Sequence, residues 1–303
     1  MTERLTKMNE SCTESTRGSA EDILGTAPAN TRFWFLVESR NPFNPKVTKQ
    51  GPVYDLLSPL IDRLKLVIPS ARVQFIRRAG AKTVGKPLVA FIADARGPVG
   101  HLWTRSFTAY DELLDMDWSG RDDAMPPSGF KPHDRPLVLV CTHGKRDACC
   151  ALHGRAFMKG LSEANSPFVW ESSHIGGHRF AATCVTLPDG HYYGHLSASD
   201  ANKLVEEARN DRLYDLRTYR GLAQLPMDAQ FAEGRLRQRL QLHGKDEVLF
   251  MGQDPTGVHA FRVVDSDQSY RARVHTSMSN QRRRKSCGTD VEPFPLYSLE
   301  WLD

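Results

Sequence analysis

The sequence predicts an α/β fold in two parts, followed by a small β-rich tail. Short apolar runs suited to buried strands recur through residues 31–196, separated by segments with helical spacing of apolar residues. A segment rich in proline, glycine and charge, at 117–136, divides these runs into two groups. After residue 230 the runs are short and alternate, which is typical of a β-rich extension.

The first group predicts an N-terminal α/β domain over 23–125, preceded by a polar leader over 1–22. The leader lacks the apolar region of a secretory signal, and we expect it to be disordered. The continuous apolar run PLVAFIAD suits an interior strand of a sheet. The expected elements are strands at 31–38, 73–78 and 87–94, and a helix at 53–66.

The second group predicts a domain over 134–227 with a thioredoxin-like α/β layer. Pro188-Asp189-Gly190 separates two short strands and is a strong hairpin signal. The remainder, 228–303, reads as a basic helix at 228–243 and a β-rich extension. The expected elements of the domain are strands at 136–141, 168–173, 180–187 and 191–195, and helices at 148–163 and 197–210.

Composition excludes several classes of protein. Of 303 residues, 40% are hydrophobic and 25% charged, as in an ordinary globular protein. With 40 basic and 36 acidic residues the formal charge is +4, too small to indicate a nucleic-acid partner. No stretch approaches the roughly 20 apolar residues of a membrane helix. We therefore expect a cytoplasmic protein without a membrane or nucleic-acid partner, and the sequence leaves its oligomeric state open.

Cysteine spacing points to metal or redox chemistry. Six cysteines in a cytosolic chain of this length do not indicate a disulfide scaffold. Three of them, Cys141, Cys149 and Cys150, lie within ten residues. In a reducing compartment such a group is typical of a metal or redox site.

Two loops carry the residues for such a site. The first is Cys141-Thr-His-Gly-Lys-Arg-Asp-Ala-Cys149-Cys150, and the second is Ser173-His174-Ile-Gly-Gly-His178-Arg179. Each follows an expected strand, which gives its ligands a rigid base. Gly176 and Gly177 permit positive φ and a close backbone approach, so both flanking imidazoles can turn to one point. Thiolate and imidazole together suit zinc, iron or copper.

A cluster with two thiolates on one iron and two imidazoles on the other is the Rieske kind of ligand set. Neutral imidazole removes negative charge and raises the reduction potential. Imidazole can also lose a proton on oxidation, so electron transfer becomes coupled to proton transfer. A compact alternative uses His143 and His153 beside Cys141 and Cys150, but a Rieske protein has two well-separated loops. The histidines of the second loop are therefore the better candidates.

The motifs C-T-H-G-K-R-D-A-C-C and S-H-I-G-G-H-R-F-A-A-T, with the P-D-G-H-Y-Y-G turn, resemble the sucrase/ferredoxin-like family, described as thioredoxin-like ferredoxins. The resemblance covers most of residues 20–225. It implies a 2Fe–2S cluster bound by Cys141, Cys150, His174 and His178. It also implies a redox carrier, rather than an enzyme with its own small-molecule substrate, that works with a redox partner protein. The residues expected around the cluster are His143, Arg146, Cys149, Gly176, Gly177 and Arg179.

Two other functions use the same residues. Two cysteines and two histidines are a common zinc set. A thiol-disulfide oxidoreductase would use Cys149 or Cys150 as nucleophile, although the spacing lacks the usual C-x-x-C. The N-terminal half lacks ligand motifs, and is either a degenerate sister of the cluster domain or a docking module. The basic run at 281–286 is expected to be a solvated loop, with docking of an acidic partner as the alternative.

Overall fold

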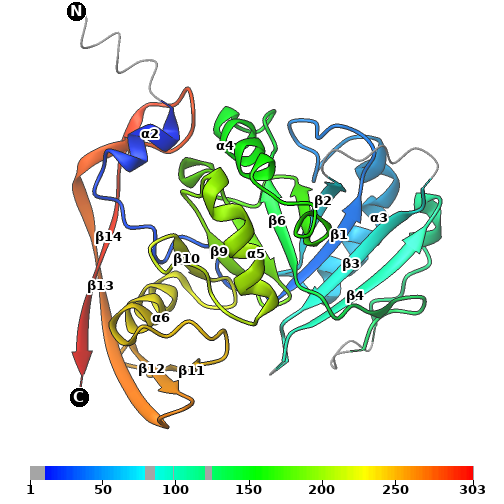
Figure 1. Cartoon of the computed structure of the whole chain (residues 1–303). Coiled ribbons are helices and arrows are strands. Elements are labelled where there is room, and N and C mark those ends of the chain that lie inside the picture. The colour runs from blue at the N-terminus through cyan, green and yellow to red at the C-terminus, as the bar shows by residue number, and fades with distance from the viewer. Residues whose placement is uncertain (1–10, 79–85, 98, 120–124, 303) are drawn as a thin grey trace, which may run out of the picture.

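One ten-stranded mixed sheet forms the centre of the molecule (Figure 1). The computed structural model describes residues 11–78, 86–97, 99–119 and 125–302. The strand order is β10-β9-β8-β6-β7-β2-β1-β3-β4-β5. The strands are β1 Phe33–Glu38, β2 Arg72–Arg78, β3 Leu88–Asp94, β4 His101–Phe107, β5 Lys131–Pro132, β6 Leu137–Cys141, β7 Val169–Ser172, β8 Cys184–Leu187, β9 His191–Tyr193 and β10 Tyr219–Leu222.

The two halves of this sheet repeat one topology. In the first half, β1 lies parallel to β2 and antiparallel to β3, and β3 pairs with β4 antiparallel. In the second half, β6 lies parallel to β7 and antiparallel to β8, and β8 pairs with β9 antiparallel. The antiparallel pairing of β2 with β7 joins the halves into one sheet. The repeated topology is what the sister-domain alternative for the N-terminal half requires.

Helices connect and cover the strands as the sequence predicts, which confirms the α/β class. Helix α3 (Pro52–Val67) joins β1 to β2, and α4 (Ala148–Lys159) joins β6 to β7. Helix α5 (Ala201–Arg209) follows β9. The apolar face of α3 buries Leu57, Leu60 and Leu64 against the first half of the sheet. The strands β4 and β10 were not expected; β4 mixes basic and polar residues with apolar ones, and β10 contains a glycine.

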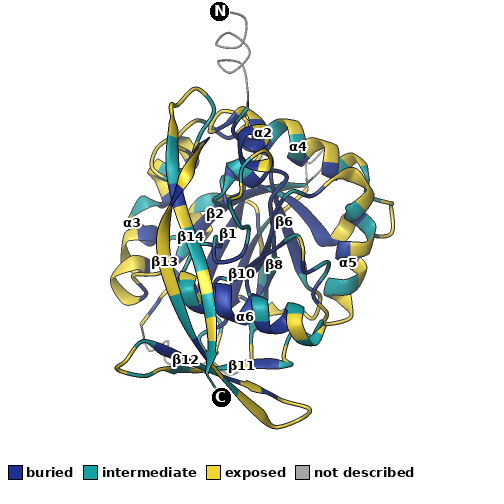
Figure 2. Ribbon diagram, turned by 90° about the vertical axis from the view of Figure 1, so that its left-hand side faces the viewer, coloured by how far each residue is buried: buried dark blue, intermediate teal, exposed yellow. Residues whose placement is uncertain are grey.

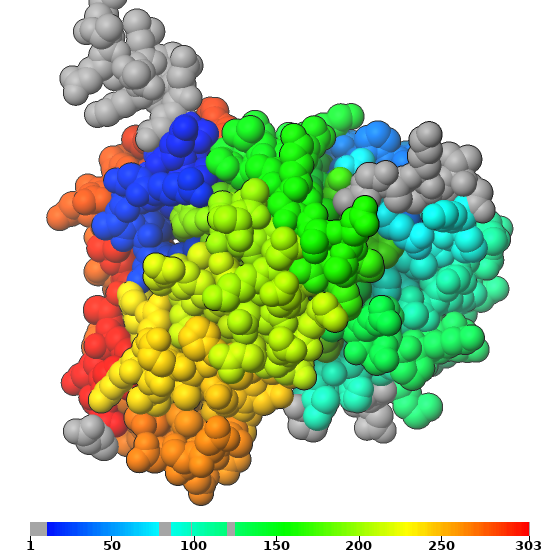
Figure 3. Space-filling model, viewed as in Figure 1, coloured from blue at the N-terminus to red at the C-terminus, as the bar shows by residue number. Residues whose placement is uncertain are grey.

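A second, four-stranded antiparallel sheet forms the C-terminal part (Figure 2). It follows α6 (Met227–Leu240) and contains β11 Val248–Gln253, β12 Val258–Val263, β13 Gln268–Arg284 and β14 Val291–Leu302. This confirms the expected β-rich tail. The long hairpin β13–β14 runs along one side of the molecule, from α6 to the N-terminal segment (Figure 3). Much of the run at 281–286 therefore belongs to a strand rather than to a solvated loop.

The described part of the expected leader is ordered, contrary to the prediction. Residues Cys12–Arg17 form the short helix α2, which begins at a capping box between Ser11 and Glu14. The helix buries Cys12, Thr13 and Thr16 and packs against β13 and the loop after Gly177. The polar composition of the leader gave no sequence pattern from which these long-range contacts could be predicted. Residues 1–10 lie outside the described residues.

No helix in the described ranges has the length and apolar character that crossing a lipid bilayer requires.

Candidate metal centre

The pair Cys141 and Cys150 is brought together by direct packing of α4 on β6. Cys141 ends β6, and Cys150 lies in the first turn of α4. A Cβ atom on Gly154, one turn later, would lie only 2.1 Å from the carbonyl oxygen of Cys141. Only glycine therefore allows the helix to lie this close to the strand end. Glycine is a poor helix former, yet Gly154 is what lets α4 bring Cys150 to Cys141.

The glycine loop is anchored at its start by β2. Ser173 N–H donates to the Phe75 carbonyl at 2.8 Å, and Ser173 Oγ donates to Gln74 Oε1 at 2.6 Å. Gly176 and Gly177 then adopt φ of 104° and 77°, as their sequence predicts. These are left-handed values that other residues rarely adopt.

A buried arginine supports the same loop through a hydrogen bond. Arg220 on β10 donates from Nη1 to the Gly176 carbonyl at 3.1 Å and hydrogen-bonds Thr26 through Nε and Nη2. Arg72 donates to the Ile175 carbonyl at 3.1 Å. A Cβ atom on Gly177 would lie 2.3 Å from Arg220 Nη2. Burial, together with the nearby Arg179, lowers the pKa of Arg220 to about 9. Sequence reasoning gave no signal for either arginine.

The predicted ligands meet at the ends of β6 and β7. His174 Nδ1 lies 3.7 Å from the sulfur of Cys141 and 3.7 Å from that of Cys150. These three ligand atoms all lie within 4.8 Å of one another. The ring of His178 lies beside that of His174, with 5.2 Å between centroids. All four predicted ligands therefore gather in one place, three of them as a compact group.

One ring nitrogen of His178 is available to bind a metal. Its Nε2 lies 2.6 Å from Ser286 Oγ and 3.7 Å from a carboxylate oxygen of Asp147, acceptors that favour a hydrogen on Nε2. Its Nδ1 is buried and has no hydrogen-bond partner among the described residues. A buried nitrogen without a partner is costly. A metal bound at Nδ1 would supply the missing interaction, so the residues present fit a metal group.

His143 positions the loop rather than joining the ligands. Its Nε2–H donates to the Asn44 carbonyl at 2.7 Å, and its Nδ1 accepts the backbone N–H of His174 at 3.2 Å. Both ring nitrogens are thus occupied. Burial is the main influence on His143 and lowers its pKa, which keeps the ring neutral and able to accept.

Electrostatics favour a thiolate at Cys141, whereas the hydrogen bond with Cys141 and burial raise the pKa of the Cys150 thiol. The hydrogen bond from Cys150 is the largest influence on Cys141 and lowers the pKa of the Cys141 thiol, and His174 lowers it further against the effect of burial. Burial lowers the pKa of His178, against the opposing charge of Asp147. A thiolate and a neutral imidazole are the protonation states that bind metals.

The other residues expected around the centre have different surroundings. Arg146 is exposed in the turn before α4. Arg179 forms an ion pair with the buried Glu21 at 2.8 Å, and Glu21 also pairs with Arg283 of β13 at 2.7 Å. Cys149 turns away from Cys141 and Cys150 and packs with Cys12 and Cys287. Ser286 and Glu21 contact the centre or its loop from more than one hundred positions away, so no local pattern indicated them.

The centre opens to solvent at His174. This half-buried ring lies at the junction of two shallow hollows that share Thr48 and Lys49. The basic side chains that line these hollows are Lys46, Lys49, Lys65, Arg72 and Arg146.

Comparison with known proteins gives a family and two partial relatives. Residues 23–221 match the family model described as Sucrase/ferredoxin-like. A protein of Meyerozyma guilliermondii named Altered inheritance of mitochondria protein 32 is 30% identical over 95 residues, which are 28% of this chain and 34% of that protein. The protein of that name from Eremothecium gossypii is 32% identical over 83 residues, which are 26% of this chain and 24% of that protein. The matched segments thus span only a minor part of either relative. No solved structure matches the chain significantly.

Proposed function

Because the chain belongs to the sucrase/ferredoxin-like family, we propose that Cys141, Cys150, His174 and His178 bind a 2Fe–2S cluster and that the protein transfers electrons. The observation that carries the proposal is the unpartnered Nδ1 of buried His178 beside the compact group of Cys141, Cys150 and His174. When bound, such a cluster supplies a one-electron acceptor. A thioredoxin-like layer and a cytoplasmic location remain part of this proposal. The names of the two relatives connect those proteins to mitochondria, so cell fractionation is the test of location.

The chain's own residues have distinct tasks in this function. The buried thiols exclude water on one side, and Ser286 and Asp147 hold the hydrogen of His178 Nε2 in place. His174 directs Nδ1 toward the thiols, so Nε2 is the atom left to exchange a proton with the solvent in the hollows. One proton taken up there for each electron gained keeps the charge of the centre constant.

The basic hollows at His174 support a proposed docking site for a redox partner. Lys46, Lys49 and Arg146 line the hollow next to the exposed ligand. We infer that an acidic redox protein binds there, because complementary charge steers association. The run at 281–286 is a poorer candidate, since Arg283 is buried between Glu21 and Glu292.

The test is metal analysis of protein purified without oxygen. About two irons and two sulfides per chain and a red-brown colour are expected. Cys141→Ser, Cys150→Ser, His174→Ala and His178→Ala should each lose the iron. His153→Ala, a histidine of α4 outside the group, should keep it. A potential that falls as the pH rises would identify the imidazole ligands. Full iron content in any of the four ligand variants contradicts the assignment.

A single zinc ion is the second candidate for the same residues. The observation that favours it is the compactness of Cys141, Cys150 and His174, whose ligand atoms lie close enough to share one ion. A two-iron cluster instead divides its ligands between two metals. A colourless protein with about one zinc at these residues would establish this alternative.

A further inference from the structure

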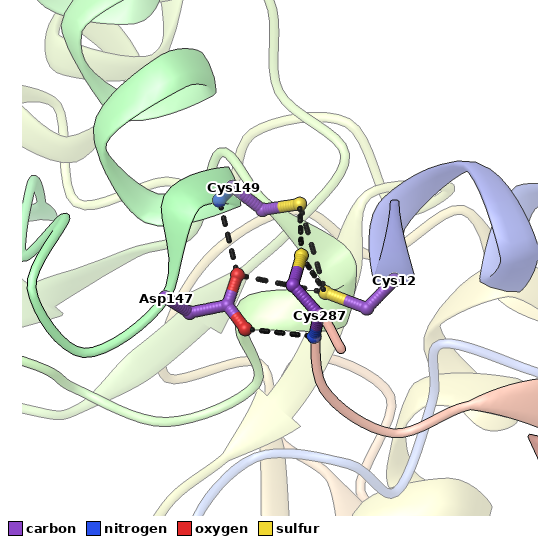
Figure 4. A group of neighbouring side chains, drawn as sticks. All are labelled: Cys12, Asp147, Cys149 and Cys287. Carbon is purple, nitrogen blue, oxygen red and sulfur yellow. Dashed lines mark hydrogen bonds between the residues drawn. The ribbon is translucent and has the colours of Figure 1, made fainter. Parts of the chain in front are cut away.

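A second group of metal-ligand side chains lies beside the candidate centre and includes none of its four proposed ligands. Cys12 of α2, Cys149 of α4 and Cys287 of the β13–β14 turn direct their sulfurs to one point (Figure 4). The three Sγ–Sγ distances are 3.6 Å for Cys12–Cys149, 3.4 Å for Cys149–Cys287 and 3.6 Å for Cys287–Cys12. Cys12 and Cys149 are buried, and Cys287 is half-buried.

A carboxylate completes the group. Asp147 Oδ1 lies 3.7 Å from Cys12 Sγ, and all four ligand atoms lie within 4.8 Å of one another. Two backbone hydrogen bonds fix the Asp147 side chain, from Cys149 N–H at 3.0 Å and from Cys287 N–H at 3.0 Å. The carboxylate is therefore held in place by the same residues whose thiols it faces.

These distances agree with one tetrahedral zinc ion. With Zn–S bonds of about 2.3 Å and Zn–O bonds of about 2.0 Å, tetrahedral angles place the sulfurs about 3.8 Å apart and the oxygen about 3.5 Å from each. The observed sulfur triangle is nearly equilateral and slightly smaller, and Asp147 Oδ1 is slightly further from Cys12 Sγ than this ideal. A small expansion of the triangle therefore suffices.

A disulfide accounts for the group less well. One disulfide uses two sulfurs and leaves the third buried beside it, whereas all three are equally spaced here. The three segments are far apart in sequence, and nothing local forces their thiols together. We propose that Cys12, Cys149, Cys287 and Asp147 bind a structural zinc ion. The ligands of this site are separate from those of the proposed cluster, and Asp147, whose Oδ2 lies 3.7 Å from His178 Nε2, is next to both.

Protons and charge balance when zinc binds. The three thiols release three protons to solvent, and the three thiolates and the carboxylate bind Zn²⁺ with a net charge of −2. The amino terminus of α4, where Cys149 lies, offsets part of this charge. The ion would join α2 and the tip of the long hairpin to α4, next to His178.

The first test is the zinc content and zinc X-ray absorption spectrum of the full chain, purified without oxygen. We expect about three sulfurs at about 2.3 Å and one oxygen at about 2.0 Å around the zinc. Zinc held at the other centre would instead show two sulfurs and nitrogen ligands. This measurement uses the unmodified protein, so it does not depend on whether a variant folds.

Variants then assign the site. Cys12→Ser with Cys287→Ser should lose this zinc and keep the iron, whereas Cys141→Ser with Cys150→Ser should lose the iron and keep this zinc. Cys184→Ala, a buried cysteine outside both groups, should keep both. Failure of the cluster proposal would show in the iron alone and leave this zinc unchanged.

Three results would overturn the proposal. The first is a full chain without zinc after growth in zinc-containing medium. The second is zinc content unchanged by the Cys12 and Cys287 substitutions. The third is an intact mass lower by two hydrogen atoms with a disulfide mapped to two of the three cysteines.

Discussion

Gly177→Ala tests whether Arg220 positions the glycine loop. The new Cβ would lie 2.3 Å from Nη2, 2.6 Å from Cζ and 2.7 Å from Nη1 of Arg220. Contacts this short cannot be kept, so the guanidinium must move. It is fully buried and donates to the Gly176 carbonyl, so a move breaks that hydrogen bond. The loop then loses its support next to His178.

Two contributions add up to the expected cost. A left-handed conformation costs a residue with a Cβ about 1–2 kcal/mol. A buried hydrogen bond of a charged group is worth about 1.5–3 kcal/mol. The free energy of unfolding should therefore fall by about 2.5–5 kcal/mol. Gly257→Ala is the matched control, because Gly257 has a φ of 82° and a Cβ there would have no atom nearer than 3.9 Å. Gly257→Ala should lower the free energy of unfolding by only about 1–2 kcal/mol.

The assay is urea unfolding of metal-free protein, so that metal binding does not contribute to the free energy. Metal content of each variant as purified is the second measurement. Gly177→Ala should lose most of its metal at the candidate centre, whereas Gly257→Ala should retain it. Equal unfolding free energies for the two variants, with normal metal content in both, would refute the role of Arg220.

Two further predictions concern the surroundings of the centre. Gly154→Ala should lower the free energy of unfolding by about 1–3 kcal/mol, because its Cβ overpacks against the Cys141 carbonyl, and should reduce metal content. Ala156→Gly, on the exposed face of α4, should lower the free energy of unfolding by about 1 kcal/mol through helix propensity and leave the metal content unchanged. Burial raises the pKa of Glu21, but hydrogen bonds from its two arginines outweigh burial and leave the pKa lowered. Its stabilising contribution is thus complete above about pH 4.3, the ordinary glutamate pKa, and disappears as the pH falls through the lowered value. Thermal unfolding measured against pH should show the unfolding temperature of the wild type approaching that of Glu21→Gln below that pH. A difference in unfolding temperature that stays constant with pH would contradict the ion-pair role.

Local sequence patterns were sufficient for the elements that carry the ligands. A strand ending at Cys141 and two glycines with positive φ between His174 and His178 follow from short runs of residues. The physical reason is that strand hydrophobicity and glycine backbone freedom act within a few positions. The gathering of the four predicted ligands was expected from the family resemblance as well.

Contacts between distant segments could not be predicted in this way. Ser286 lies 108 positions from His178, and Cys12 lies 137 positions from Cys149. A polar leader and a basic run have no apolar period that would reveal their packing, and Arg283 looks solvated until Glu21 is placed beside it. The second thiol group was missed for this reason, since Cys12 alone carries no signal.

The repeated topology of the sheet gives two of the predicted ligand positions in the second half counterparts in the first half. Glu38 pairs with Ile76 across β1 and β2 as Cys141 pairs with Ser172 across β6 and β7. Two residues further along, Arg78 is therefore the counterpart of His174. Where the second copy places a thiol and an imidazole, the first copy places a buried carboxylate and a guanidinium 3.3 Å apart. In the first half a charge pair is enough to complete this framework, so the scaffold does not need the proposed metal group in order to close.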